Sequence, residues 1–386
     1  MNIKKADRLN DVTEYYFSRK LEEIRTLNAK GFDIINLGIG SPDMPPSDET
    51  IEAAIKSLTL KSSHGYTTSR GRLELREAIA QWFSKTYQVD LKAADEILPL
   101  QGSKEGILHI SLAFLNPGDE ALVPNPGYPT YAAATKLAGA RVRPYDLTEE
   151  NDWYPDLEKL KGEDLSKVKV MWINYPHMPT GKAASEKIFQ ELALFAEVKN
   201  ILLCNDNPYS LTLNPYPLSI LKEKKRFGHC LELNSLSKSF NMAGWRVGFL
   251  VGKKEFIDTV LQVKSNMDSG MFLPIQVGAE AALRNSTTWH QKRNEIYQSR
   301  REIVYQIFDQ IKFQYDEDQV GLFVWGHAPI GVKNVEDFTN ELLYKAHVFI
   351  TPGFIFGSQG LRYARISLCA SKERLEEALK RIVEAK

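Results

Sequence analysis

A lysine flanked by hydroxyl residues lies in SLSKSFNMAGWRVGFLVG, residues 235–252, and is the strongest candidate for chemistry in the chain. A surface lysine that opens a helix is the ordinary interpretation of such a pattern. The alternative is that Lys238 is a nucleophile whose amine forms a Schiff base with a carbonyl cofactor. Ser235, Ser237 and Arg246 would then bind a phosphate of that cofactor, because hydroxyl donors and the planar guanidinium group suit phosphate oxygens.

A second candidate lies in ILLCNDNPY, where an apolar stretch ends in Asp206 and Tyr209 follows three residues later. An aspartate at such a place commonly caps a helix or forms a turn. It could instead hold a proton on a pyridine nitrogen, which is the partner that a pyridoxal ring requires to act as an electron sink. The second segment therefore strengthens the Schiff-base interpretation of the first, and the structural interpretation of each stays open.

Two strand-to-helix junctions supply further candidates. QGSKEGILHI places Ser103 and Lys104 where backbone N–H groups and the positive end of a helix would bind an anion. A serine that caps the helix would lie at the same position, so the two interpretations are compatible. In NPGYPTY, Tyr128 lies between Gly127 and Pro129, where a rigid flat ring could stack on a flat cofactor.

The elements that must position these residues alternate from about residue 96 to 280, where short apolar runs are separated by apolar residues at helical spacing. Apolar strands that are each followed by a helix are typical of a mostly parallel α/β sheet covered on both faces. Ligands of such sheets bind beyond the carboxyl ends of the strands, so we expect the candidates to meet there. The predicted strands are EILPLQG, EALVPNP, ARVRPYDL, KVMWINYP, ILLCND, CLELNSLS and RVGFLVG.

The pattern changes after Asn285, where a long amphipathic helix is predicted from about residue 286 to 311. Shorter strand and helix patterns follow, among them GLFVWG, VFITPG and YARISLCA, and a charged helix ends the chain. We therefore predict a large domain of residues 47–285. The N-terminal segment is expected to join the C-terminal part in space, so residues 1–46 and 286–386 form a smaller α+β domain.

Composition and charge exclude several other classes of protein. The 386 residues carry 49 Lys+Arg against 49 Asp+Glu, whereas nucleic acid or a membrane surface as partner would favour a basic excess. Three scattered cysteines give no disulfide framework or zinc motif and suit a reducing cytoplasm, and the seven histidines are too dispersed for a metal site. The N-terminus has no apolar stretch typical of a signal peptide, and no apolar run approaches the roughly 20 residues of a membrane span.

Taken in order along the chain, these motifs resemble the class I/II family of pyridoxal-phosphate-dependent aminotransferases, which have the aspartate aminotransferase-like fold. The resemblance extends from INLGIGSPD near the start to YARISL near the end. Within the family, LGIGSPD and KSNMDSGMF are most similar to the LL-diaminopimelate aminotransferase-like branch. The resemblance implies a fold type I enzyme with pyridoxal 5′-phosphate as cofactor. Such an enzyme moves an amino group between an L-amino acid and a 2-oxo acid by a ping-pong mechanism.

The resemblance also implies a role for each candidate residue. Lys238 matches the Schiff-base lysine, which carries the proton between the substrate α-carbon and the cofactor C4′ carbon. Asp206 matches the carboxylate on the pyridine nitrogen, Tyr209 the hydroxyl that donates to the ring oxygen O3′, and Tyr128 the stacking aromatic ring. The implied phosphate ligands are Ser103, Lys104 (through its backbone), Ser235, Ser237 and Arg246.

Further matches concern the substrate and a second subunit. Tyr66, in HGYTTSRG, matches a tyrosine that reaches the phosphate from the neighbouring subunit, so the resemblance implies a homodimer with shared active sites. Arg365, in YARISL, matches the arginine that clamps the substrate α-carboxylate, and the backbone N–H of Gly40 assists it. Tyr15 matches an N-terminal tyrosine that closes over the substrate in this branch.

One position departs from the family pattern. The family usually has N-P-T-G after a strand, and its asparagine donates to O3′, whereas this chain reads INYPHMPTG and has Met178 at that position. A thioether cannot donate a hydrogen bond, and Asn174 lies on the other side of Pro176, so we do not treat it as a replacement. We expect O3′ to keep Tyr209 but to lose a donor, so that the lysine–cofactor Schiff base holds its proton to higher pH.

Two alternatives share the same fold. A carbon–sulfur lyase or another non-transaminating pyridoxal enzyme uses the same core residues, so the motifs do not exclude it. A catalytically idle ligand-sensing module is a third possibility, but the chain has no additional DNA-binding segment and keeps the lysine, the aspartate and the tyrosine together. A nucleotide-binding dehydrogenase suits the sheet but not the glycine pattern, because GIGSPD lacks the third glycine of the dinucleotide fingerprint.

Overall fold

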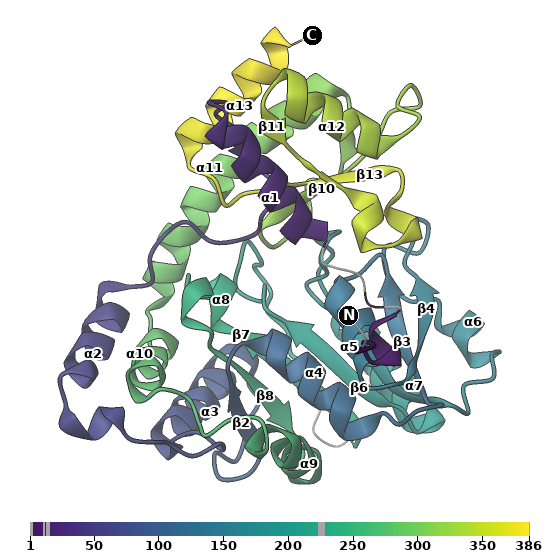
Figure 1. The fold of residues 1–386 in the computed structure, drawn as a ribbon. Coiled ribbons are helices and arrows are strands. Elements are labelled where there is room, and N and C mark those ends of the chain that lie inside the picture. The colour runs from purple at the N-terminus through teal and green to yellow at the C-terminus, as the bar shows by residue number, and fades with distance from the viewer. Residues whose placement is uncertain (1–2, 11, 13–15, 223–227, 386) are drawn as a thin grey trace.

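The computed structural model describes residues 3–10, 12, 16–222 and 228–385, and it has a seven-stranded sheet at its centre (Figure 1). The strand order is β2-β8-β7-β6-β5-β3-β4, and only β8 runs antiparallel to its neighbours. Each of the seven predicted strands is confirmed. Their bounds are β2 Ile97–Leu100, β3 Glu120–Asn125, β4 Arg141–Asp146, β5 Val168–Ile173, β6 Leu202–Asn207, β7 Cys230–Ser235 and β8 Gly248–Gly252.

Helices cover both faces of this sheet. Successive side chains of a strand point to opposite faces, and those of β6 and β7 are all buried, as are those of β5 at every position but one. On β6, Leu203 belongs to the hydrophobic cluster that includes α3, α7 and α10, whereas Cys204 belongs to the cluster that includes α4, α5 and α9. The helices of this region are α2 Asp48–Leu58, α3 Leu73–Tyr87, α4 Ser103–Phe114, α5 Pro129–Leu137, α6 Leu157–Lys161, α7 Glu186–Lys199, α8 Leu236–Ser239, α9 Lys254–Ser265 and α10 Leu273–Leu283.

The C-terminal part of the chain contains a second, smaller sheet with the order β12-β13-β10-β9. The N-terminal β1 pairs in parallel with β11 of this part, with Ile35 opposite Val348. The bounds are α1 Tyr16–Ala29, β1 Ile35–Asn36, α11 Thr287–Ile311, β9 Gln314–Tyr315, β10 Phe323–His327, α12 Val335–Lys345, β11 Val348–Phe349, β12 Thr351–Pro352, β13 Tyr363–Ser367 and α13 Lys372–Glu384.

A third hydrophobic cluster packs residues of the N-terminal segment, such as Phe17 and Leu37, against the C-terminal part. This packing supports our proposal that residues 1–46 and 286–386 form one domain and residues 47–285 the other. Met178 and Tyr209 of the large sheet region also belong to this cluster, so the two regions meet beside them. Within the described ranges, no helix combines the length and the apolar character that crossing a membrane requires.

Candidate active site

A cavity of about 530 Å³ lies where the carboxyl ends of the central strands face the C-terminal part. The candidate residues were expected to meet at this edge of the sheet, and the structure brings most of them together there. Tyr66 lies outside the cavity, and Tyr15 lies outside the described residues. The predicted site residues in the cavity lining are Gly40, Ser103, Lys104, Tyr128, Asp206, Tyr209, Ser235, Ser237, Lys238, Arg246 and Arg365.

Lys238 is held at the cavity by the short helix α8, which begins directly after β7. The Ser235 hydroxyl caps this helix by accepting a hydrogen bond from the Ser237 backbone N–H. The Lys238 amine donates to the backbone carbonyl of Gly40. Desolvation lowers the pKa of Lys238, and the guanidinium groups of Arg365 and Arg246 lower it further. A lysine with a lowered pKa has a larger fraction of neutral, nucleophilic amine at neutral pH.

Asp206 is fully buried on β6, and its two oxygens differ in their surroundings. Oδ2 accepts a hydrogen bond of 2.9 Å from the Tyr131 hydroxyl. Oδ1 is buried and has no hydrogen-bond partner among the described residues, although the residue lines the cavity. Burial raises the pKa of Asp206 to about 7, although the hydroxyl groups of Tyr131 and Ser103 lower this pKa in part. A cationic N–H group in the cavity would satisfy Oδ1 and stabilise the carboxylate.

The end of the cavity near α4 forms a cradle for an anion. Gly102 has φ +91° and ψ 154°, a conformation open essentially to glycine alone, and a Cβ there would meet Arg246 Nη2 at 2.2 Å. Ser103 is the first residue of α4, so its backbone N–H is available to a ligand. Arg246 Nη1 donates to Ser237 Oγ at 3.3 Å and to the Ala243 carbonyl at 2.9 Å. These donors suit a phosphate group.

The opposite end of the cavity is built around Arg365 on β13. Its Nη2 donates to the Gly38 carbonyl at 2.7 Å, and its guanidinium carbon lies 3.8, 4.7 and 5.6 Å from the ring centres of Phe323, Phe356 and Phe17. Gly40 packs directly on Phe323, because a Cβ at Gly40 would meet that ring at 2.2 Å. An arginine held by aromatic rings keeps a fixed orientation for a carboxylate ligand.

Met178 is buried beside this arginine, with its sulfur 3.1 Å from Arg365 Nη1. Asn174 also lines the cavity, but its amide is engaged by the backbone: Nδ2 donates to the Asp206 carbonyl, and Oδ1 accepts from Met178 N at 2.8 Å. The geometry therefore supports the sequence interpretation that Asn174 does not replace the missing donor. Tyr209 lies on the same side, edge-on to Phe323, and burial raises its pKa so that it remains a donor.

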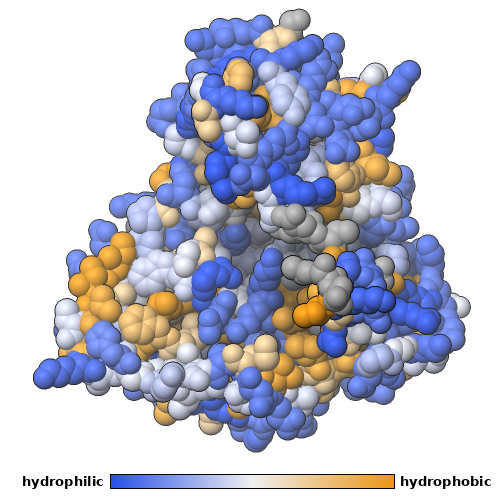
Figure 2. Space-filling model, viewed as in Figure 1, coloured by the Kyte–Doolittle hydropathy of each residue, from blue (hydrophilic) through white to orange (hydrophobic). Residues whose placement is uncertain are grey.

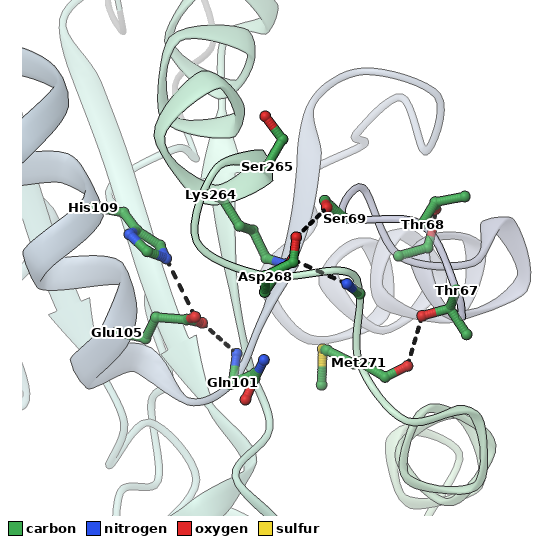
Figure 3. A network of polar contacts seen from close by, with 12 residues as sticks. Thr67, Thr68, Ser69, Gln101, Glu105, His109, Lys264, Ser265, Asp268 and Met271 are labelled. Atoms are coloured by element: carbon green, nitrogen blue, oxygen red, sulfur yellow. Dashed lines mark hydrogen bonds and ion pairs between the residues drawn. The ribbon is translucent and has the colours of Figure 1, made fainter. Parts of the chain in front are cut away.

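Tyr66 is 94% exposed in the single chain, but the loop behind it is fixed (Figure 3). Thr67 Oγ1 donates to the Met271 carbonyl at 2.7 Å, and Ser69 Oγ donates to the Asp268 carbonyl at 3.1 Å. Asp268 forms a buried ion pair with Lys264 and also accepts a hydrogen bond from Gly270 N. These added hydrogen bonds offset part of the desolvation cost of the buried pair. The loop is thus a rigid platform for an exposed tyrosine.

The sequence motifs did not indicate several residues that contact Asp206 and Arg365. Tyr131 contacts Asp206, and the rings of Phe17, Phe323 and Phe356 surround Arg365. A signal existed for Tyr131, because it follows Tyr128 by three residues at the start of a helix and so lies on the same helix face. The phenylalanines belong to three separate segments, and no local pattern connects them to the arginine.

This arrangement defines a class of enzyme. A mostly parallel α/β sheet presents a lysine, a buried carboxylate with one free oxygen, and a phosphate cradle, which is the donor set for pyridoxal phosphate. The chain belongs to the class I and II aminotransferase family, whose family model matches residues 33–382. It is a pyridoxal-phosphate-dependent aminotransferase of fold type I.

The similarity to individual relatives extends along almost the whole chain. The chain is 38% identical over 382 residues to an LL-diaminopimelate aminotransferase of Moorella thermoacetica, which covers 98% of each chain. The substrate-bound BacF structure from Bacillus subtilis superposes with a TM-score of 0.94 at 35% identity, covering 100% of this chain and 98% of that chain. An aminotransferase structure from Staphylococcus aureus gives a TM-score of 0.89 at 28% identity, with 98% of both chains covered.

Proposed function

We propose that this aminotransferase takes its amino group from L-amino acids with an apolar side chain and passes it to a 2-oxo acid. The observation that carries the substrate class is the lining of the cavity around Arg365. That lining is apolar, and Asp206 is the only carboxylate among the described residues of the cavity. The apolar side chains there are those of Phe17, Leu21, Ile39, Met178, Phe323 and Phe356.

The proposed roles follow from the two ends of the cavity. Ser103, Ser235, Ser237 and Arg246 hold the phosphate, with the backbone of Lys104 assisting at the start of α4. Asp206 Oδ1 receives the ring nitrogen, Tyr209 donates to O3′, and Tyr128 covers the ring. When bound, pyridoxal phosphate supplies an aldehyde that takes up the amino group and a ring that delocalises negative charge.

Arg365 binds the α-carboxylate of the amino acid, with the Gly40 backbone beside it, and so directs the α-carbon towards Lys238. The Lys238 amine, with its lowered pKa, removes the proton from the α-carbon and delivers it to the cofactor C4′ atom. Such a positioned acid–base group contributes roughly 10²–10⁴-fold to the rate. The same lysine acts in both halves of a ping-pong exchange.

The apolar lining sets the expected preference among amino acids. Burial of one large apolar side chain is worth about 1.5–3 kcal/mol, or about ten- to a hundredfold in relative rate. LL-diaminopimelate ends in a second ammonium and a second carboxylate, which would both need polar partners. The described lining offers apolar side chains around Arg365 and only one acid, Asp206, at the cofactor end. The substrates that we propose for this enzyme therefore differ from LL-diaminopimelate, which appears in the names of these relatives.

We also propose that the enzyme forms a homodimer. Figure 2 shows hydrophobic side chains gathered on the side of the molecule where α2 lies. Exposed apolar residues of this area include Ile55, Leu58 and Leu60, and Phe272 lies against His64 nearby. Exposed apolar patches of this kind favour a protein partner. A second copy of the chain would cover the patch and receive Tyr66 at its phosphate cradle. The free cysteines favour a cytoplasmic location.

The test is a panel of single half-reactions, scored by the absorbance change as bound cofactor becomes aminated. L-Leucine, L-phenylalanine and L-methionine are compared with L-glutamate, L-lysine and LL-diaminopimelate. We expect kcat/KM to be at least about tenfold higher for the first group. If LL-diaminopimelate or L-glutamate reacts fastest, the apolar substrate class is wrong. Release of ammonia without a matching exchange of amino group would indicate a lyase instead.

A further inference from the structure

Tyr131 is a fully buried residue of α5 whose hydroxyl donates to Asp206 Oδ2 at 2.9 Å. Its ring stacks on Trp172 of β5, with ring centres 5.3 Å apart and planes at 10°. It is also edge-on to Tyr128, at 5.7 Å and 85°. Ring contacts on two sides fix the direction in which the hydroxyl points. The hydrogen bond is therefore a product of the packing of α5 on the sheet.

The hydrogen bond from Tyr131 leaves the two oxygens of Asp206 in different surroundings. Oδ2 is taken by Tyr131, whereas Oδ1 has no hydrogen-bond partner among the described residues. A carboxylate held at one oxygen cannot rotate freely about its Cβ–Cγ bond, so the other oxygen keeps a fixed direction. Burial and the neighbouring carboxylate raise the pKa of Tyr131 well above its usual value, so the phenol stays protonated and remains a donor.

We propose that Tyr131 is a positioning residue that orients Asp206 and keeps the proton on the cofactor's ring nitrogen rather than on the carboxylate. The inference rests on the proposed role of Asp206 as partner of that nitrogen. A phenol that donates to a carboxylate makes it a weaker base, so a proton shared between the carboxylate and the ring nitrogen stays on the nitrogen. Loss of the phenol would both free the carboxylate to rotate and make it more basic. Both effects leave the ring nitrogen less protonated.

The experiment compares holoenzymes reconstituted with pyridoxal phosphate carrying ¹⁵N in the ring, using the ¹⁵N NMR signal at neutral pH. The test variant is Tyr131→Phe, which keeps the ring stacked on Trp172. The matched control is Tyr145→Phe, because Tyr145 is also buried and donates to the Trp172 backbone carbonyl at 2.7 Å without touching Asp206. Asp206→Ala is the third variant. The dissociation constant of the cofactor is measured for each.

In wild type and Tyr145→Phe we expect the signal at the position of a protonated ring nitrogen. In Tyr131→Phe it should move towards the unprotonated position, and the cofactor dissociation constant should rise about tenfold, as for loss of one hydrogen bond to a charged group. A Tyr131→Phe signal and affinity equal to those of Tyr145→Phe, with Asp206→Ala shifted, would overturn the role of Tyr131. An unshifted Asp206→Ala signal would instead overturn the role proposed for Asp206.

Discussion

At the scale of single residues, the site works by burying ionisable groups and then supplying their partners. Burial raises the pKa of Asp206 to about 7 and lowers that of Lys238, so both groups are shifted towards their uncharged forms in the single chain. In the proposed role of Asp206, a cationic ring nitrogen beside it would favour the charged carboxylate. The neutral lysine amine is the form that attacks a carbonyl. Desolvation therefore favours a cationic partner for Asp206 and leaves more of Lys238 as the neutral, nucleophilic amine.

Lys238→Ala should fold and still bind pyridoxal phosphate through the phosphate cradle, but it should lose at least about 10²–10⁴-fold in turnover, because the acid–base group is absent. The measurement is amino-group transfer together with borohydride reduction and mass analysis of the lysine-containing peptide. Lys254→Ala serves as the control, because the Lys254 side chain is exposed at the start of α9, and it should keep both activity and labelling. Near-normal turnover in Lys238→Ala would remove this lysine from its role.

Met178→Asn restores an amide donor at the position where the family pattern has asparagine. We expect the proton on the Lys238–cofactor linkage to be lost at lower pH than in wild type, by about one pKa unit, because a new hydrogen bond stabilises the O3′ phenolate. An absorbance-monitored pH titration measures this. Met178→Leu supplies no donor and should titrate as wild type does. Identical titrations of all three proteins would show that O3′ does not sense position 178.

At the scale of elements, the site depends on turns that follow strands. Short junctions after β2 and β7 place Ser103 and Lys238 directly at the sheet edge. Residues 38–41 line the cavity, and their segment is held by Asp43, whose two oxygens each accept a 2.7 Å hydrogen bond from Arg300 of α11. This ion pair fixes the segment that carries Gly38 and Gly40.

Gly102→Ala tests the turn between β2 and α4. The variant should lose about 1–3 kcal/mol in free energy of unfolding from backbone strain, and its added Cβ should displace Arg246. Gly118→Ala is a matched control, because Gly118 also has a positive φ of +97° but nothing within 4 Å of the added Cβ. Urea unfolding should show a loss in both, whereas only Gly102→Ala should bind pyridoxal phosphate more weakly, by at least about tenfold. Equal cofactor affinities would contradict the cradle.

At the scale of the whole molecule, the proposed homodimer would give the exposed Tyr66 a contact surface on a second copy of the chain. Hydrogen bonds tie its loop to the 264–272 segment, and the side chain is exposed and lies outside the cavity of its own chain. Tyrosine combines an apolar ring with a polar hydroxyl, which suits it to a contact surface. Two copies related by a two-fold axis would each give a tyrosine to the other.

Mixed dimers of Tyr66→Ala and Lys238→Ala subunits test this exchange. If Tyr66 serves the partner's site, one of the two sites in the mixed dimer has both wild-type residues, so activity should return to about half that of wild type. Each homodimeric variant should remain impaired. Differently tagged subunits are co-expressed, purified through both tags and assayed. A mixed dimer no more active than the better homodimer would show that Tyr66 does not act across an interface.

The sequence by itself determined the class of the protein. The strands are runs of apolar residues, and the lysine, the aspartate and the Ser103 junction each lie within a few residues of a strand end, so local patterns were sufficient to place them. The seven strands were predicted from these patterns, and the cofactor and the enzyme class from the motifs together with their resemblance to the family. All three predictions are confirmed. The domain boundaries, the roles of the site residues and the dimer stay predictions.

Only the tertiary structure decided which residues surround those groups. Tyr131 and Asp206 are 75 residues apart in the chain, and Met178 and Arg365 are 187 apart. Their contacts arise from the packing of α5 on the sheet and of the C-terminal part on the strand ends. No periodicity encodes such pairs, because a helix or strand pattern specifies the buried face of an element but not the residue that it meets. The proposed substrate class rests on the same kind of contact, since it depends on side chains from distant segments.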